Sequence, residues 1–290
     1  MRERLMRFST RPNRLRRCAT AVALATAATA ATLCGPALAG AADYDGDGPA
    51  DFAIWRPSDG NWWILGSARG EQLPVRQWGA SSDKPAPGDY DGDGRTDVAI
   101  WRPSDGTWWI LGSARGEQLP VRQWGASGDR PVPGDYDGDG RTDVAIWRPS
   151  DGTWWVLGSA RGEQLPVPQL GASGDRPVPG DYDGDRRTDF AVWRPSTGMW
   201  YVIRSSNGEQ VTQRWGTSGD RPVPADYDGD RRTDFAVWRP STGTWYVIRS
   251  SNGEQVTQWG ATGDEPIFDT GLPPAPITGG LSPAPAAGER

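Results

Sequence analysis

Four aspartates fall within nine residues in the stretch Asp89–Asp97, which reads D-Y-D-G-D-G-R-T-D. Carboxylates at positions 1, 3, 5 and 9, together with the backbone carbonyl at position 7, form a hard, oxygen-only ligand set. Such a set favours calcium over zinc or copper. Glycines at positions 4 and 6 allow the chain to wrap tightly around an ion. This stretch, called here the aspartate loop, therefore predicts a calcium site.

The aspartate loop recurs five times, in repeat units that begin at Asp43, Asp89, Asp135, Asp181 and Asp226. A single copy could be a solvated Asp-Gly turn, but four carboxylates repel one another without a counter-ion, and five copies at fixed spacing favour a metal. The loop has no glutamate at position 12 and no flanking helices, which excludes an EF-hand. The predicted ligands are Asp43, Asp45, Asp47, Asp51, Asp89, Asp91, Asp93, Asp97, Asp135, Asp137, Asp139, Asp143, Asp181, Asp183, Asp185, Asp189, Asp226, Asp228, Asp230 and Asp234.

The fourth and fifth repeats depart from this pattern. They carry Arg186 and Arg231 at position 6, where a tightly wound backbone prefers glycine. We therefore expect up to five calcium ions, with weaker binding or a distorted loop in these two repeats. Calcium of this kind would hold the fold together rather than carry out chemistry.

Short β-rich segments surround each loop and position it. In the second repeat they cover residues 85–90, 98–101, 107–111 and 118–124, and turn residues such as Arg102–Gly106 separate them. Four short strands in 45 or 46 residues are typical of a propeller blade, and five repeats predict five blades. The expected fold class is therefore all-β, a β-propeller of five four-stranded blades.

The two ends of the chain differ from the repeats. Residues 1–39 combine seven arginines, an apolar run and Ala37-Leu38-Ala39, which predicts a secretory signal peptide and a secreted, extracellular protein with no membrane span. The propeller is expected over residues 40–269. Residues 265–269 repeat the start of a first strand, and we expect them to pair with the first blade and close the ring. The Pro/Ala-rich residues 270–290 are expected to be disordered.

Composition argues against an enzyme. The chain has no histidine, and both cysteines, Cys18 and Cys34, lie in the predicted signal peptide, so the common catalytic triads and dyads are missing. Residues 1–39 hold seven of the 31 Lys and Arg and one of the 37 Asp and Glu, so the remainder carries a net charge of −12. This charge disfavours nucleic acid as a partner and favours cations.

The repeats resemble the FG-GAP, or VCBS-type, repeats of integrin alpha-subunit propellers and of many secreted proteins. The resemblance covers residues 43–269 and rests on D-x-D-G-D-G-x-x-D, with W-G-A-S-G-D-R-P-V-P-G as a variant of the family's F-G and G-A-P elements. It implies that the loop joins the first two strands of a blade and holds calcium. Family propellers most often have seven blades, so five is a departure. The motif does not imply a particular biochemical role.

Tryptophan supplies the candidates for a ligand surface. Most of the 17 tryptophans are expected to pack between blades, but some near turns could stack on sugar rings, as aromatic faces do in glycan sites. The candidates are Trp78, Trp124, Trp215 and Trp259, and Leu170 interrupts the series.

Three functions follow from these residues. The first is a non-enzymatic calcium-binding propeller that binds glycans or cell-surface proteins multivalently. The alternatives are a protein-interaction scaffold without sugar affinity and a secreted polysaccharide hydrolase using a carboxylate pair. The ligand, the oligomeric state and closure of the ring within one chain are left open by the sequence.

Overall fold

The computed structural model describes residues 43–47, 51–67, 70–251 and 253–258. The chain divides into two units, Met1–Cys34 and Gly35–Arg290, and all of the described residues belong to the second. None of them forms a helix long and apolar enough to cross a membrane. The predicted signal peptide, closing strand and C-terminal tail lie outside the described residues.

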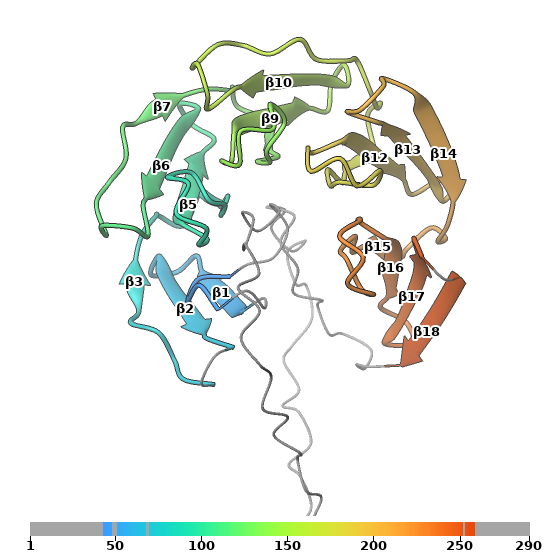
Figure 1. Ribbon diagram of the computed structural model, residues 1–290, viewed down its shortest axis with the longest axis horizontal. Helices are drawn as coiled ribbons and strands as arrows, with labels where there is room; N and C mark the ends of the chain where they lie inside the picture. Colours follow the sequence, from blue (N-terminus) through green and yellow to red (C-terminus); the bar gives the residue numbers. More distant parts are fainter. Residues whose placement is uncertain (1–42, 48–50, 68–69, 252, 259–290) are drawn as a thin grey trace, which may run out of the picture. The chain divides into compact units, whose positions relative to one another are not determined.

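Five antiparallel sheets follow one another in sequence order and make the blades of a five-bladed β-propeller (Figure 1), which confirms the predicted fold class. The first blade contains β1 (Phe52–Arg56), β2 (Asn61–Leu65) and β3 (Arg76–Gln77). The second contains β4 (Lys84–Pro85), β5 (Val98–Arg102), β6 (Thr107–Leu111) and β7 (Arg122–Gln123). The third contains β8 (Arg130–Pro131), β9 (Val144–Arg148) and β10 (Thr153–Leu157). The fourth contains β11 (Arg176–Pro177), β12 (Phe190–Arg194), β13 (Met199–Ile203) and β14 (Gln210–Arg214). The fifth contains β15 (Arg221–Pro222), β16 (Phe235–Arg239), β17 (Thr244–Arg249) and β18 (Gly253–Gln258).

A pair of tryptophans organises each blade. In the second blade Trp101 of β5 lies opposite Trp108 of β6, and both side chains are fully buried. Their indole N–H groups donate to one acceptor, the carbonyl oxygen of Trp124, at 3.1 and 3.0 Å. Buried polar groups need such partners. The tryptophan pair therefore ties the two central strands to the segment that ends the blade.

The hydrophobic core lies between neighbouring blades. Trp101 and Trp108 of the second blade belong to one buried cluster with Val144 and Ile146 of the third. Trp147 and Trp154 of the third blade form the corresponding cluster with residues of the fourth. Each blade thus covers the next, as expected for repeats that cannot bury their apolar faces alone.

The third blade has three strands where the sequence predicts four. Its last segment makes only two isolated bridges, Leu157–Gln164 and Thr153–Gln169. In the second blade Trp108 pairs with Arg122, but the third repeat carries Pro168 at the position of Arg122. Proline has no N–H to donate to a β-ladder, so it explains the missing strand.

Replacing this proline is expected to complete the blade. In the variant Pro168→Arg the restored N–H allows the ladder to extend by a residue pair, which should raise the free energy of unfolding by about 1 kcal/mol. The urea midpoint and the hydrogen exchange of residues 167–169 would measure this. A midpoint lower than that of the parent protein would contradict the explanation.

The first blade also has three strands within the described residues. No described residue forms its inner strand, the one that precedes the aspartate loop in the other blades. The sequence predicts a weak or missing first strand here. Pairing with residues 265–269 stays a prediction, since those residues are not described.

Candidate metal centres and an adjoining pocket

The aspartate loop joins the first strand of a blade to the second, as β4 to β5 in the second blade. Asp89 starts the turn, because its Oδ1 accepts the Gly92 N–H at 2.7 Å and its Oδ2 accepts the Gly94 N–H at 2.9 Å. Gly92 and Gly94 have φ values of 78° and 85°, in the left-handed region that glycine adopts without a steric penalty.

The arginines at position 6 of the last two loops keep this shape at a cost. Arg186 and Arg231 have φ values of 72° and 70°, and their N–H groups donate to Asp181 and Asp226 at 2.9 and 2.8 Å. The left-handed conformation costs a non-glycine residue about 1–2 kcal/mol. These two loops therefore keep the hydrogen bond to position 1 and carry strain, whereas the sequence left weaker binding and a distorted loop as alternatives.

The aspartate at position 9 is the anchor of the loop. Asp143 is fully buried; its Oδ2 accepts the Tyr136 N–H at 2.8 Å and the Asp137 N–H at 3.2 Å, and its Oδ1 accepts the Ser159 N–H at 2.6 Å. The serine follows position 9 by sixteen residues in every repeat. The five serines are Ser67, Ser113, Ser159, Ser205 and Ser250. Their fixed spacing was a signal that the sequence analysis missed.

Three aspartates of each loop come together, with one carboxylate oxygen of each within 4.8 Å of the others. In the first four loops they occupy positions 1, 3 and 9, as Asp89, Asp91 and Asp97 do. In the fifth loop they are Asp226, Asp228 and Asp230, at positions 1, 3 and 5. The five triads, one per blade, could each bind a metal ion such as Ca²⁺.

Position 5 lies outside the triads of the first four repeats, although the sequence predicted it as a ligand. Asp93 instead accepts the Ser113 hydroxyl at 2.9 Å and the Arg95 N–H at 2.9 Å. Asp47 and Asp185 accept the corresponding serine hydroxyls at 2.7 and 2.9 Å. The aspartate at position 5 thus links the loop to the turn after the third strand.

The charges of the triads fit a cation. Burial, with a smaller contribution from the aspartate at position 3, raises the pKa of Asp97 to about 6 and that of Asp143 to about 7. In addition, Asp91 Oδ1 is buried and has no hydrogen-bond partner among the described residues. A divalent ion would supply that partner and would favour the ionised carboxylates. The residues present therefore fit calcium.

The described tryptophan candidates lie between blades. Trp78, Trp124 and Trp215 are half-buried, and their indole N–H groups donate to backbone carbonyls of the following blade, at Trp109, Trp155 and Tyr246. The distances are 2.9, 3.0 and 2.9 Å. The N–H groups are therefore engaged within the fold. Trp259 lies outside the described residues.

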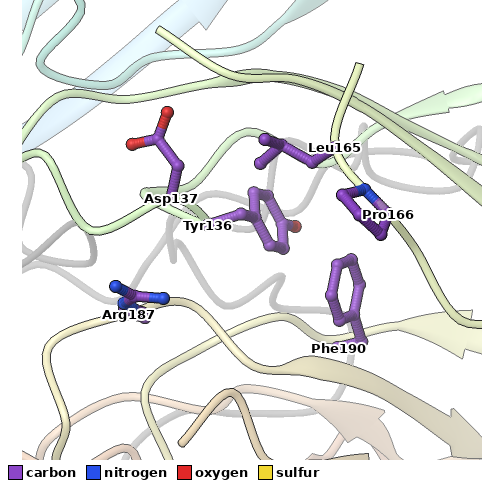
Figure 2. A pocket seen from close by; sticks show the side chains of 6 residues that line it. All are labelled: Tyr136, Asp137, Leu165, Pro166, Arg187 and Phe190. Carbon is purple, nitrogen blue, oxygen red and sulfur yellow. The ribbon is translucent and has the colours of Figure 1, made fainter. Parts of the chain in front are cut away.

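A pocket of about 260 Å³ adjoins the third aspartate loop, at the junction of the third and fourth blades (Figure 2). Asp137 and Arg187 lie at one end of it, and Pro166 and Phe190 at the other. The remaining lining residues are Tyr136 and Leu165. The Phe190 ring stacks on Tyr136, with centroids 4.9 Å apart, so it is held in place at the edge of the pocket.

This junction combines the two kinds of repeat. The third repeat supplies Leu165-Pro166, which the fourth replaces by Val211-Thr212. The fourth supplies Phe190, and the second and third have Val98 and Val144 at that position. Among the described junctions between blades, only this one has a Leu-Pro pair on one blade and a phenylalanine on the next. The combination of side chains that lines the pocket therefore recurs at no other described junction.

The sequence matches the profile of the FG-GAP-like repeat family four times, over residues 43–100, 89–146, 135–192 and 181–237. These matches cover more than half of the chain, so the protein belongs to the FG-GAP-like repeat family. A search of curated protein sequences gave no match.

Solved structures with a similar fold include a lectin from Agrocybe aegerita described as recognising non-reducing terminal N-acetylglucosamine. It is 17% identical, with a TM-score of 0.50, and the alignment covers 76% of this chain and 65% of the lectin. Virginiamycin B lyase from Staphylococcus aureus is 11% identical, with a TM-score of 0.48 and 72% and 67% covered. A Bacteroides caccae protein of unknown function is 11% identical, with a TM-score of 0.46 and 73% of each chain covered. The chain spans just under two thirds of the lectin's length. At these identities the likeness concerns the fold alone.

Proposed function

We propose that this protein is an exported, non-enzymatic, calcium-stabilised propeller that binds carbohydrate. The observation that carries the proposal is the pocket between the third and fourth blades. It places an aromatic side chain at one end and a guanidinium and a carboxylate at the other. Apolar ring faces suit the apolar faces of sugars, and the two charged groups suit their hydroxyls.

Calcium bound at the third triad would hold one wall of this pocket in place. Asp137 belongs both to the pocket lining and to the third triad, and Tyr136 precedes it in the same loop. An ion bound by Asp135, Asp137 and Asp143 would fix the wall of the pocket through its own ligands. Binding of sugar is therefore expected to require calcium.

The variant Phe190→Val tests the site. Valine occurs naturally at this position in the second and third repeats, so the change should be tolerated, while the aromatic edge of the pocket is lost. We expect affinity for the best glycan on an array to fall about fivefold, since stacking on an aromatic ring contributes about 1 kcal/mol.

Phe235→Val is the matched control, because Phe235 contacts Tyr182 and Trp200 as Phe190 contacts Tyr136 and Trp154. It should leave the affinity unchanged. Equal losses in both variants would assign the effect to the fold. A folded, calcium-loaded protein without any glycan signal would favour the protein-interaction scaffold, and turnover of a polysaccharide would favour the hydrolase.

A further inference from the structure

A second charged feature lies at the inner strands, away from the pocket. Each described inner strand begins with a cation, and that cation follows an aspartate in the sequence. The four cations, called here the inner cation row, are Lys84, Arg130, Arg176 and Arg221. They start the strands that end in the aspartate loops. The row therefore lies at the end of these strands opposite to the predicted calcium sites.

The aspartates that precede the row do not neutralise it. Asp129 is buried and accepts two hydrogen bonds from Arg148, at 2.8 and 2.9 Å. Asp83 accepts two from Arg102, both at 2.9 Å. The aspartate and the cation after it have different neighbours, since Asp129 binds Arg148 while Arg130 lies over a tryptophan ring. Each of these carboxylates is already bound bidentately by another arginine.

The cations of the row rest on tryptophan rings instead. Lys84 Nζ lies 5.9 Å from the centroid of the Trp101 ring, and Arg130 Cζ lies 5.5 Å from that of Trp147. Arg176 and Arg221 lie 5.7 and 5.9 Å from the corresponding rings. All four are half-buried. Such stacking holds each cation in a defined orientation.

Lys84, Arg130 and Arg176 form no ion pair with a carboxylate of the described residues. Arg130 Nη1 donates one long hydrogen bond, 3.5 Å, to the carbonyl oxygen of Asp175 in the next blade. Burial lowers the pKa of Lys84 and of Arg130, and the charge of the next cation along the row lowers it further. The hydrogen bond to Asp175, the residue before Arg176, places Arg130 beside the next member of the row.

We propose that the inner cation row binds an oxyanion, a carboxylate, sulfate or phosphate group, between neighbouring blades. Guanidinium groups recognise these anions through parallel N–H donors, and stacking on tryptophan holds Arg130 and Arg176 ready for this. An anion between them would replace mutual repulsion by attraction on both sides. The net negative charge of the chain does not oppose this, because the acidic loops lie at the other end of the strands.

Isothermal titration of the purified protein with sodium sulfate, in millimolar calcium and a constant background of sodium chloride, tests the site. A parallel titration with glucuronate distinguishes a small free anion from the carboxylate of an acidic sugar. We expect saturable binding of at least one of the two. The variant Arg130→Gln should weaken it about tenfold or more. Arg122→Gln, at an exposed position of the outer strand β7, should bind as the parent does.

Arg130→Lys keeps the experiment decisive if the glutamine variant is unstable. Lysine occurs naturally at this position in the second repeat, as Lys84, so the variant should fold and retain part of the affinity. Absence of saturable heat with both anions would overturn the proposal, as would unchanged affinity in Arg130→Gln. Neither outcome affects the carbohydrate site, which uses other residues.

Discussion

Removal of calcium is expected to lower the melting temperature of the purified protein by about 20 °C. A site with free calcium at about ten times its dissociation constant contributes about 1.4 kcal/mol, so five triads contribute about 7 kcal/mol. In a domain of this size each kcal/mol corresponds to about 2–4 °C. The loss would be comparable with the whole net stability of an ordinary domain.

Circular dichroism melts in millimolar calcium and in EDTA measure this effect. Magnesium at the same concentration is the control, because its smaller radius and strict octahedral geometry suit these loops poorly, and it should restore only part of the stability. Equal melting temperatures in calcium and EDTA would contradict the account. The loops would then be solvated Asp-Gly turns.

The second large effect is expected from the variant Asp143→Ala. Three backbone N–H groups, of Tyr136, Asp137 and Ser159, lose their acceptor in a fully buried position. An unsatisfied buried donor costs about 1–3 kcal/mol, so the free energy of unfolding should fall by about 4 kcal/mol. Denaturant titration measures this. The loss should persist in EDTA, since it arises from hydrogen bonds as well as from the metal.

Asp139→Ala is the matched control in the same loop. Asp139 occupies position 5, lies outside the third triad and accepts the Arg141 N–H at an exposed site. Its removal should cost less than about 1 kcal/mol. If the two variants lost equal stability, position 9 would not be the anchor of the loop.

The loop pattern predicted that aspartates of each repeat come together, because spacing and residue type determine which carboxylate oxygens can meet. It could not assign position 5. Whether Asp93 lies with the other carboxylates or accepts the Ser113 hydroxyl depends on the turn after β6, which a local motif does not describe. The predicted four strands are present in the second, fourth and fifth blades. The prediction was wrong for the third blade, where Pro168 lacks the backbone N–H that a fourth strand would need.

The pocket was beyond the reach of the sequence for a related reason. Leu165-Pro166 and Phe190 come from different repeats, and only the packing of one blade on the next brings them together. The same packing engages the indole N–H groups of Trp78, Trp124 and Trp215. The prediction that these tryptophans bind sugars therefore stands on their exposed ring area alone.

Equilibrium dialysis of the purified protein against calcium tests the central claim most directly, because it counts the ions without relying on stability or ligand. The five triads predict close to five bound ions per chain. Asp91→Ala, which removes a carboxylate of the second triad, should reduce the count by one. No calcium bound at millimolar concentration would contradict the assignment of the aspartate loops as metal centres.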